Sequence, residues 1–387
     1  MSGLLVLVVR YALRRPVQTL VVGLSIAVAI ALPVAGRLIT ERYEQRLADR
    51  ASTVPLVVGA PGSRYDLAMA TLFYRGQPPT PLPLAAVDRL AAENRGLAVP
   101  IRLAGRAGGA SIVAVGFEFF EARGLSTRLG TLPLRLGDAV VGADRARVLG
   151  LAPGDVITTD RREIFDLSLP TPIDLRVVGV LEPTGQPDDD AVFIDIETAW
   201  IIAGFSHAHV AADEAGEGDR TLETDRRLVL RPTLETVTEV TDENLAEFHL
   251  HAERAGLPIT AVLVFPESRK DLTILKAAIN GRAERLAVEP ALLVDELFEA
   301  VFRIRPVFDA IAAVLGLSTA CLVVLSSFLA AKLRSGEFQT LDHIGAPRWF
   351  VAGLIAGQTI IVCVLGIAAA AGAVLLSLFA IEAFVGI

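Results

Sequence analysis

Three long apolar runs, separated by polar stretches of unequal length, dominate the hydropathy pattern of this chain. The first, Val17 to Gly36, has 20 residues and no charge; the second, 307–330, has 24 residues and one charge, Asp309. At about 1.5 Å per residue, 20 helical residues cross a hydrocarbon core of about 30 Å. The third run, Trp349 to Gly386, has 38 residues. The pattern predicts three membrane-spanning helices, or four if the third run is a hairpin; we favour one long helix.

A short basic segment precedes the first run. Residues 1–16 carry Arg10, Arg14 and Arg15 among apolar residues, a pattern typical of a helix that lies in the cytoplasmic interface. Because basic residues concentrate on the cytoplasmic side, the N-terminus is expected inside and the following region outside. A cleavable signal peptide is the alternative for the first run, although this run is longer than the usual apolar region of such a peptide.

A polar island, 331–349, separates the second and third runs. Within it, Phe338, Leu341 and Ile344 recur three residues apart, which predicts an apolar stripe on a short helix that stops at Gly345. The basic residues that flank it are those expected of a cytoplasmic loop. An ordinary solvated connector is the alternative interpretation.

Between the first and second runs, strand and helix signals alternate. The clearest strand signals are Val54–Val58, 97–103, 110–117, Leu175–Leu181, Ala191–Ile196 and Ile259–Phe265. Mixed-charge or amphipathic segments at both ends predict stalk helices, and the polar segment 206–227 predicts a flexible excursion. The expected fold class is therefore a membrane α-helical protein with a large α+β extracytoplasmic domain carried on helical stalks.

The predicted organisation follows directly from these patterns. In chain order it comprises a cytoplasmic interfacial helix (1–16), a first span (17–37), the extracytoplasmic domain with its stalks (38–306), a second span (307–330), a cytoplasmic coupling loop (331–349) and a third transmembrane helix (350–387).

Charge and cysteine content narrow the function classes. Residues 38–304 hold 28 basic and 40 acidic residues, a net charge of about −12, which argues against a nucleic-acid partner. The two cysteines, Cys321 and Cys363, both lie in apolar runs. An extracytoplasmic domain in this chain would therefore fold without disulfides.

Motifs of nucleotide hydrolysis are absent from the sequence. The lysines, Lys270, Lys276 and Lys332, are never preceded by glycine, so no Gly-Lys-Ser/Thr phosphate loop exists. A Gly-x-Ser-x-Gly elbow and a His-Glu-x-x-His helix are also missing. We expect a chain without catalytic residues.

Two His-x-His pairs are the candidate metal ligands: His207 with His209, and His249 with His251. On an extended strand, residues i and i+2 point to the same side, so each pair could bind one zinc ion. Solvated histidines with no metal are the alternative. The triplet 188–190, three aspartates, is expected to begin a turn and to stay hydrated.

Several segments resemble one known family, the ABC transporter permeases of the macrolide-exporter, lipoprotein-releasing and FtsX-like group. The start, Leu-Val-Val-Arg-Tyr-Ala-Leu-Arg-Arg-Pro-Val-Gln-Thr-Leu, is similar to the basic segment before the family's first span. Three further segments resemble the family's extracytoplasmic domain: Val-Val-Gly-Ala at 140–143, Gly-Leu-Ala-Pro-Gly-Asp at 150–155, and residues 177–185. Glu337 to Ala346 is similar to its cytoplasmic loop.

The resemblance implies a mechanotransmission permease of the inner membrane. Such a subunit dimerises, with a homodimer favoured, and docks separate ATPase subunits that bind ATP and Mg²⁺. A periplasmic or lipoprotein partner is a further expectation. In the loop, Glu337, Phe338, Leu341, Ile344 and Gly345 would couple to the ATPase.

Two points stay open at this stage. The family usually has three spans after the large domain and this sequence has two apolar runs there, so a fourth span would have to come from elsewhere. The substrate and direction of transport are also undetermined. The alternative function is an FtsX-like signalling scaffold that regulates an envelope enzyme, and metal-linked transport through the histidine pairs is a lower alternative.

Overall fold

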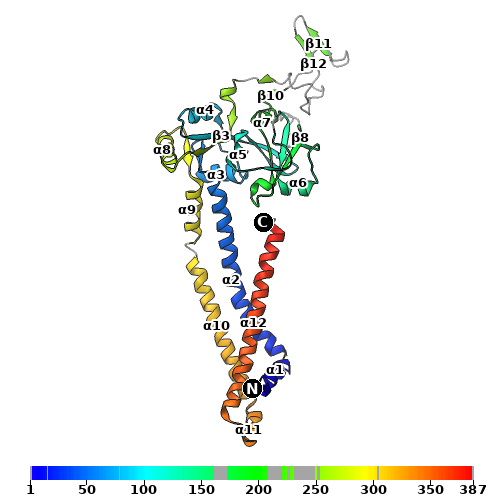
Figure 1. The fold of residues 1–387 in the computed structure, drawn as a ribbon, viewed down its shortest axis with the longest axis vertical. Coiled ribbons are helices and arrows are strands. Elements are labelled where there is room, and N and C mark those ends of the chain that lie inside the picture. The colour runs from blue at the N-terminus through cyan, green and yellow to red at the C-terminus, as the bar shows by residue number, and fades with distance from the viewer. Residues whose placement is uncertain are drawn as a thin grey trace. The chain divides into compact units, whose positions relative to one another are not determined.

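The computed structural model describes most of the chain. The described residues are 2–14, 16–77, 79–133, 135–160, 172–207, 220–224, 227–230, 249–250, 253–302 and 305–385. They divide into two compact units, a helical unit of Met1–Arg46 with Glu296–Ile387, and a mixed domain of Leu47–Asp295 (Figure 1). Each unit is described by itself.

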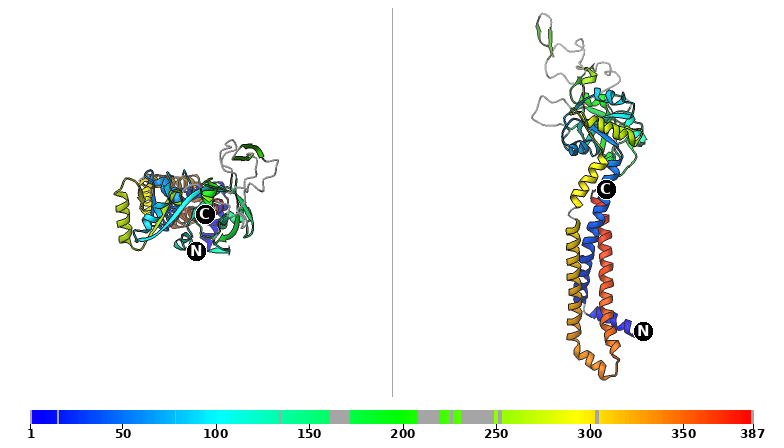
Figure 2. Two further views of the ribbon diagram at one scale, coloured as in Figure 1. Left: turned by 90° about the horizontal axis from the view of Figure 1, so that it is seen from above. Right: turned by 90° about the vertical axis from the view of Figure 1, so that its left-hand side faces the viewer.

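The helical unit is built from long apolar helices. Its elements are α1 (Ser2–Arg14), α2 (Pro16–Ser52), which continues into the other unit, α10 (Arg305–Leu333), α11 (Ser335–His343) and α12 (Arg348–Val385). Among the residues that the structure describes, three helical stretches are long and apolar enough to cross a membrane: Thr19–Ser52, Pro306–Leu333 and Trp349–Ala380. The third apolar run forms one continuous helix, and α11 joins it to α10 (Figure 2).

Glycines on α12 let neighbouring helices approach closely. A Cβ atom on Gly366 would lie 2.8 Å from Cβ of Ile26 on α2, and one on Gly357 would lie 2.9 Å from Cγ2 of Val8 on α1. Small residues allow such packing in membranes, where burial of apolar surface gives little drive for association. Val22 and Ile26 of α2 pack with Val362 of α12 in a small buried cluster.

The mixed domain is organised around a ten-stranded sheet (Figure 1). The strand order is β16 (Leu286–Val288), β1 (Leu56–Gly59), β15 (Ala261–Pro266), β3 (Gly96–Ala107), β4 (Ala110–Val115), β9 (Ala191–Asp195), β6 (Asp138–Val141), β8 (Asp174–Leu181) and β5 (Thr127–Gly130), with β7 (Val156–Thr158) paired to β8. The pairs β4–β9 and β6–β8 are parallel, and the others are antiparallel.

Short helices cover both faces of the sheet. They are α3 (Arg64–Leu72), α4 (Ala85–Ala91), α5 (Glu118–Ala122), α6 (Ala143–Leu149), α7 (Ile196–Ile202) and α8 (Arg269–Asn280). Because strand side chains alternate, Val113 and Val115 of β4 pack in one buried cluster while Ile112 and Ala114 pack in another. The sheet therefore has a core on each face, which explains the nearly continuous apolar runs at its central strands.

The remaining described elements are small. They are the strands β2 (Leu82–Pro83), β10 (Ser206–His207), β11 (Arg220–Thr224), β12 (Arg227–Leu230), β13 (His249–Leu250) and β14 (Pro258–Ile259), the 3₁₀ turns η1 (Pro187–Asp190) and η4 (Arg254–Gly256), and the helix α9 (Pro290–Phe302). The predicted excursion at 206–227 lies largely outside the described residues. Within it, β11 begins an antiparallel hairpin with β12.

Candidate functional site

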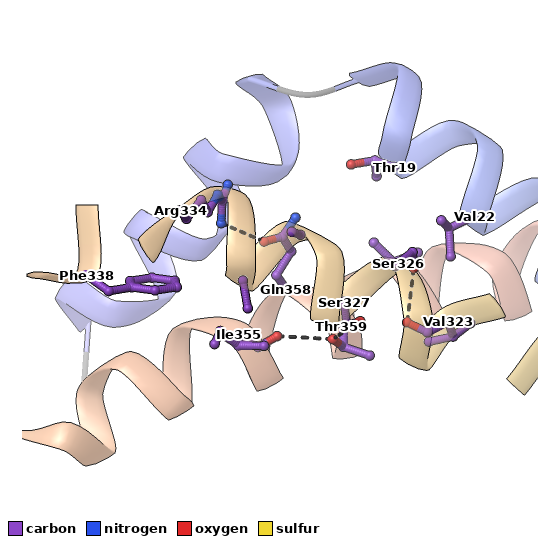
Figure 3. A pocket seen from close by; sticks show the side chains of 13 residues that line it. Thr19, Val22, Val323, Ser326, Ser327, Arg334, Phe338, Ile355, Gln358 and Thr359 are labelled. Carbon is purple, nitrogen blue, oxygen red and sulfur yellow. Dashed lines mark hydrogen bonds between the residues drawn. The ribbon is translucent and has the colours of Figure 1, made fainter. Parts of the chain in front are cut away.

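A polar seam joins the helices of the helical unit next to α11 (Figure 3). Ser327 of α10 and Thr359 of α12 are hydrogen-bonded through their hydroxyl oxygens, 3.1 Å apart. Arg334, between α10 and α11, donates from Nη1 to Oε1 of Gln358 on α12 at 3.0 Å. A cavity of about 30 Å³ lies beside these groups, with Thr19 of α2 also in its lining. It has room for a water molecule among polar partners.

Arg334 connects the short helix to the longest one. Its side chain is 3% exposed, so its hydrogen bond to Gln358 is shielded from solvent. Because the residue lies at the N-terminus of α11, this contact holds one end of α11 against α12. In the sequence, Arg334 is one of the basic residues that indicate a cytoplasmic loop, and no local pattern identifies Gln358 as its partner.

The five predicted coupling residues lie on or just beyond α11. Phe338 lines the cavity (Figure 3), and Leu341 is half-buried. Glu337 is exposed on the first turn, and Ile344, 76% exposed, lies directly after the helix. Gly345 follows with φ of +84°, a left-handed conformation that glycine adopts without strain and that ends the helix. Their contact with an ATPase stays a prediction.

A second polar cluster, which we call the ion cluster, lies inside the mixed domain. It consists of Arg50 in the last turn of α2, Tyr74 after α3, Arg123 after α5 and Asp188 in η1. The Asp188 side chain is fully buried, and the side chains of both arginines are 2% exposed. Residues far apart in the sequence therefore meet at one carboxylate.

Hydrogen bonds engage both oxygens of that carboxylate. Arg50 donates to Oδ2 at 2.5 Å and to Oδ1 at 3.1 Å, a two-pronged contact that suits the planar guanidinium. Arg123 donates to Oδ2 at 2.7 Å, and the Tyr74 hydroxyl donates to Oδ1 at 2.7 Å. Arg50 also donates from Nε to the carbonyl of Leu72 at 2.6 Å. The end of α2 is thus bonded to α3 and to η1.

The electrostatics of the ion cluster favour the ionised aspartate. Burial by itself would raise the pKa of Asp188, but the positive charges of Arg50 and Arg123 outweigh it and hold the pKa below its ordinary value. Burial, and then the neighbouring Arg50, lower the pKa of Arg123. Burial, with the Asp188 charge beside it, raises the pKa of the Tyr74 hydroxyl. Two cations and one anion leave the cluster with a net positive charge.

The ion cluster corrects one prediction from the sequence. The triplet 188–190 does form a turn, η1, but Asp188 and Asp189 are not hydrated: they are 0% and 4% exposed. Asp189 accepts hydrogen bonds from the backbone N–H groups of Thr184 and Gly185, and only Asp190 faces solvent, where it pairs with Arg145. Arginines distant in the sequence make the burial of Asp188 possible, and no local signal identifies them.

The structure describes half of the predicted histidine ligands. His207 of β10 and His249 of β13 are register partners in an antiparallel pair, so the backbone brings the two motifs together. His209 and His251 lie outside the described residues. Within the described part of the chain, no group of three or more metal-ligating side chains occurs. Zinc binding stays a prediction.

Comparison with known families assigns the chain to one of them. The family model for the MacB-like periplasmic core domain matches residues 19–243, more than half of the chain. The chain belongs to this family. The resemblance drawn from the sequence is confirmed: the protein is a MacB/FtsX-like ABC transporter permease with an extracytoplasmic domain and membrane helices.

Solved structures with similar regions were also found. The periplasmic region of MacB from Actinobacillus actinomycetemcomitans is 11% identical, covers 64% of this chain and 94% of its own, and has a TM-score of 0.35. The extracellular domain of YknZ, a noncanonic ABC-type transporter from Gram-positive bacteria, is 9% identical and covers 60% and 98%, with a TM-score of 0.33. No curated protein matches the chain. At such TM-scores these structures add nothing to the family assignment.

Proposed function

We propose that this chain is the non-catalytic permease subunit of an ABC transporter. A separate ATPase subunit hydrolyses ATP, and this chain converts that work into a conformational change of its extracytoplasmic domain that exports or extracts a substrate. Family membership and the missing phosphate loop support the division of labour. In this proposal the conformational change occurs in this chain, and ATP hydrolysis occurs in the ATPase subunit.

One observation carries the coupling mechanism. Helix α2 is continuous from Pro16 to Ser52, beginning in the helical unit and ending in the ion cluster of the mixed domain. In this proposal α2 transmits displacement along its axis, and buried charge-assisted hydrogen bonds keep its end fixed in the mixed domain. Pro33, inside α2, removes one backbone hydrogen bond of the helix and marks the point where it bends most easily. A movement of α2 would therefore displace Tyr74, Arg123 and Asp188 together.

The proposed mechanism begins at α11, in the helical unit. We propose that α11 faces the cytoplasm and docks the ATPase, with the N-terminus also inside and three spans in each subunit. The hydrogen bond between Arg334 and Gln358 supports this role, because it ties the docked helix to α12. From family membership we further propose a dimer in the cytoplasmic membrane with two ATPase subunits.

The test is ATPase activity of the assembled complex. The full chain, co-expressed with a candidate ABC ATPase subunit, is purified in lipid nanodiscs and assayed for ATP hydrolysis and co-purification. Glu337→Lys and Leu341→Asp change the charge and the apolar stripe of α11, and each is expected to weaken ATPase association about tenfold. Activity is expected only when both chains are present.

Asp342→Lys is the matched control, because Asp342 is an exposed acid on α11, five residues after Glu337 and therefore about 140° around the helix from it. It is expected to keep at least half of the wild-type association. Wild-type activity and co-purification in both Glu337→Lys and Leu341→Asp would mean that the loop is a mere connector, and the coupling proposal would fail.

A further inference from the structure

Helix α1 is a separate short helix that packs against α12. It ends at Arg14 and α2 begins at Pro16, because a proline disfavours helical backbone in the residue before it and suits the first position of a new helix. Val8 of α1, 4% exposed, lies against Gly357 of α12. In Figure 2, α1 (dark blue) projects sideways from α12 near α11. One face of α1 is therefore covered by α12, and the opposite face is not.

The uncovered face of α1 carries both apolar and basic side chains. Val6, Arg10 and Leu13 lie about 140–160° around the helix axis from Val8. Leu13 is 73% exposed, and Val6 and Arg10 are exposed as well. Arg14, four residues after Arg10, is exposed next to them. Exposed apolar side chains bordered by cations are typical of a helix that lies in a membrane interface.

The positive charge on this face has no acidic partner in the part of the chain that the structure describes. Neither Arg10 nor Arg14 takes part in an ion pair with a described residue. Residues 1–40 contain four arginines and no acid, and α12 has no acid before Glu382. Farther along α2 the pattern changes, because Arg37 pairs with Glu41. The charge on α1 therefore calls for an anion from outside the chain.

Two occupants of this face can be compared by their charge. A second copy of α1 would bring four guanidinium groups together without an acid, and like charges in contact are unfavourable. An anionic phospholipid supplies acyl chains for the apolar side chains and a phosphate for the arginines. The lipid is thus complementary to the face in both respects.

We propose that the uncovered face of α1 binds anionic phospholipids. With α12 in the bilayer, α1 lies along the membrane surface, where Val6 and Leu13 contact acyl chains and Arg10 and Arg14 donate hydrogen bonds to the headgroup phosphate. This inference concerns the lipid contact of α1, so it can fail while the proposed ATPase coupling through α11 stands.

Native mass spectrometry of the full chain in a non-ionic detergent provides the test. The protein is mixed with equal amounts of phosphatidylglycerol, which is anionic, and phosphatidylcholine, which has no net charge, with identical acyl chains. The expected result is that the wild type binds phosphatidylglycerol about tenfold more tightly than phosphatidylcholine. In Arg10→Gln/Arg14→Gln this preference is expected to fall to about twofold or less.

Two control variants separate the charge of α1 from other effects. Arg10→Lys/Arg14→Lys keeps the charge and is expected to keep the preference. Arg42→Gln/Arg46→Gln removes two exposed arginines at the same spacing from α2, on a segment that also carries Glu41 and Glu44, and is expected to leave the preference unchanged.

Four outcomes would overturn the proposal. They are equal binding of the two lipids by the wild type, an unchanged preference in Arg10→Gln/Arg14→Gln, equal losses in the glutamine and lysine variants of α1, and an equal loss in Arg42→Gln/Arg46→Gln. Equal binding of the two lipids together with loss of ATPase co-purification in Arg10→Gln/Arg14→Gln would assign this face to a protein partner instead.

Discussion

Replacement of Asp188 by asparagine tests the ion cluster most directly. Asparagine has nearly the same shape as aspartate, so the change removes charge while packing is retained. The two guanidiniums of Arg50 and Arg123 would then face each other around a neutral amide that can no longer accept hydrogen bonds at both ends.

The expected cost follows from the burial. The Asp188 side chain is fully buried and both arginines are 2% exposed, so water cannot replace the lost charge. Loss of one partner from a buried ion pair costs about 3–5 kcal/mol, because the remaining charge is left without compensation. For a domain of this size, 1 kcal/mol corresponds to roughly 2–4 °C in Tm. We expect the Tm of the mixed domain to fall by about 6–20 °C.

The assay follows unfolding of the mixed domain in the full chain. The chain has two tryptophans, so in a Trp349→Phe background the emission reports Trp200, which is fully buried in that domain. Thermal scans in nanodiscs then give Tm for the background protein and for Asp188→Asn under the same conditions.

Asp190→Asn is the matched control, because Asp190 belongs to the same triplet but its side chain is 52% exposed. Its pair with Arg145 is expected to contribute at most about 1 kcal/mol. If Asp188→Asn lowered Tm no more than Asp190→Asn does, the ion cluster would not hold the end of α2, and the reasoning would be refuted.

Three further outcomes are expected. The pKa of Asp188 is lowered in the folded state, so the ionised carboxylate stabilises the fold fully at any pH above its unfolded pKa of about 4. This stabilisation is lost as the pH falls through the folded pKa. The difference in Tm between the wild type and Asp188→Asn should therefore be constant at neutral pH and shrink below about pH 4. Gly366→Ala is expected to destabilise the helical unit by about 1–3 kcal/mol in steric-trapping unfolding, whereas Gly372→Ala, with no atom within 4 Å of the added carbon, should not. A double-mutant cycle of Arg334→Met and Gln358→Leu, read by the same unfolding, should give a coupling of roughly 1 kcal/mol, and additive effects would contradict their pairing.

The ion cluster illustrates the difference between stability and specificity. A buried pair is weak evidence for net stability, since an apolar replacement of the whole cluster could be as stable. Its geometric demand is stricter, because three side chains, from α2 and from just after α3 and α5, must meet at the two carboxylate oxygens of Asp188. A fixed geometry at the end of α2 is the property that the proposed mechanical role requires.

Much of the architecture could be predicted from the sequence. Length and continuity of the apolar runs predicted α2, α10 and α12, since crossing a bilayer sets a minimum length on any helix. Strand signals located β3, β4, β8 and β9, because strands covered on both faces carry nearly continuous apolar residues. The three-residue spacing from Phe338 and the glycine at 345 located α11 and its end.

Only the tertiary structure decided what those elements do together. The sequence shows three adjacent aspartates, and their charge predicts hydration. The fold buries Asp188 among Arg50 and Arg123, which come from segments far away in the chain, and it buries Asp189 against nearby backbone N–H groups. The parallel pairing of β4 with β9 likewise depends on strand order, which local periodicity does not encode. Hydrophobic periodicity is set by near neighbours and so specifies elements, whereas charge partners and sheet order depend on contacts between distant segments.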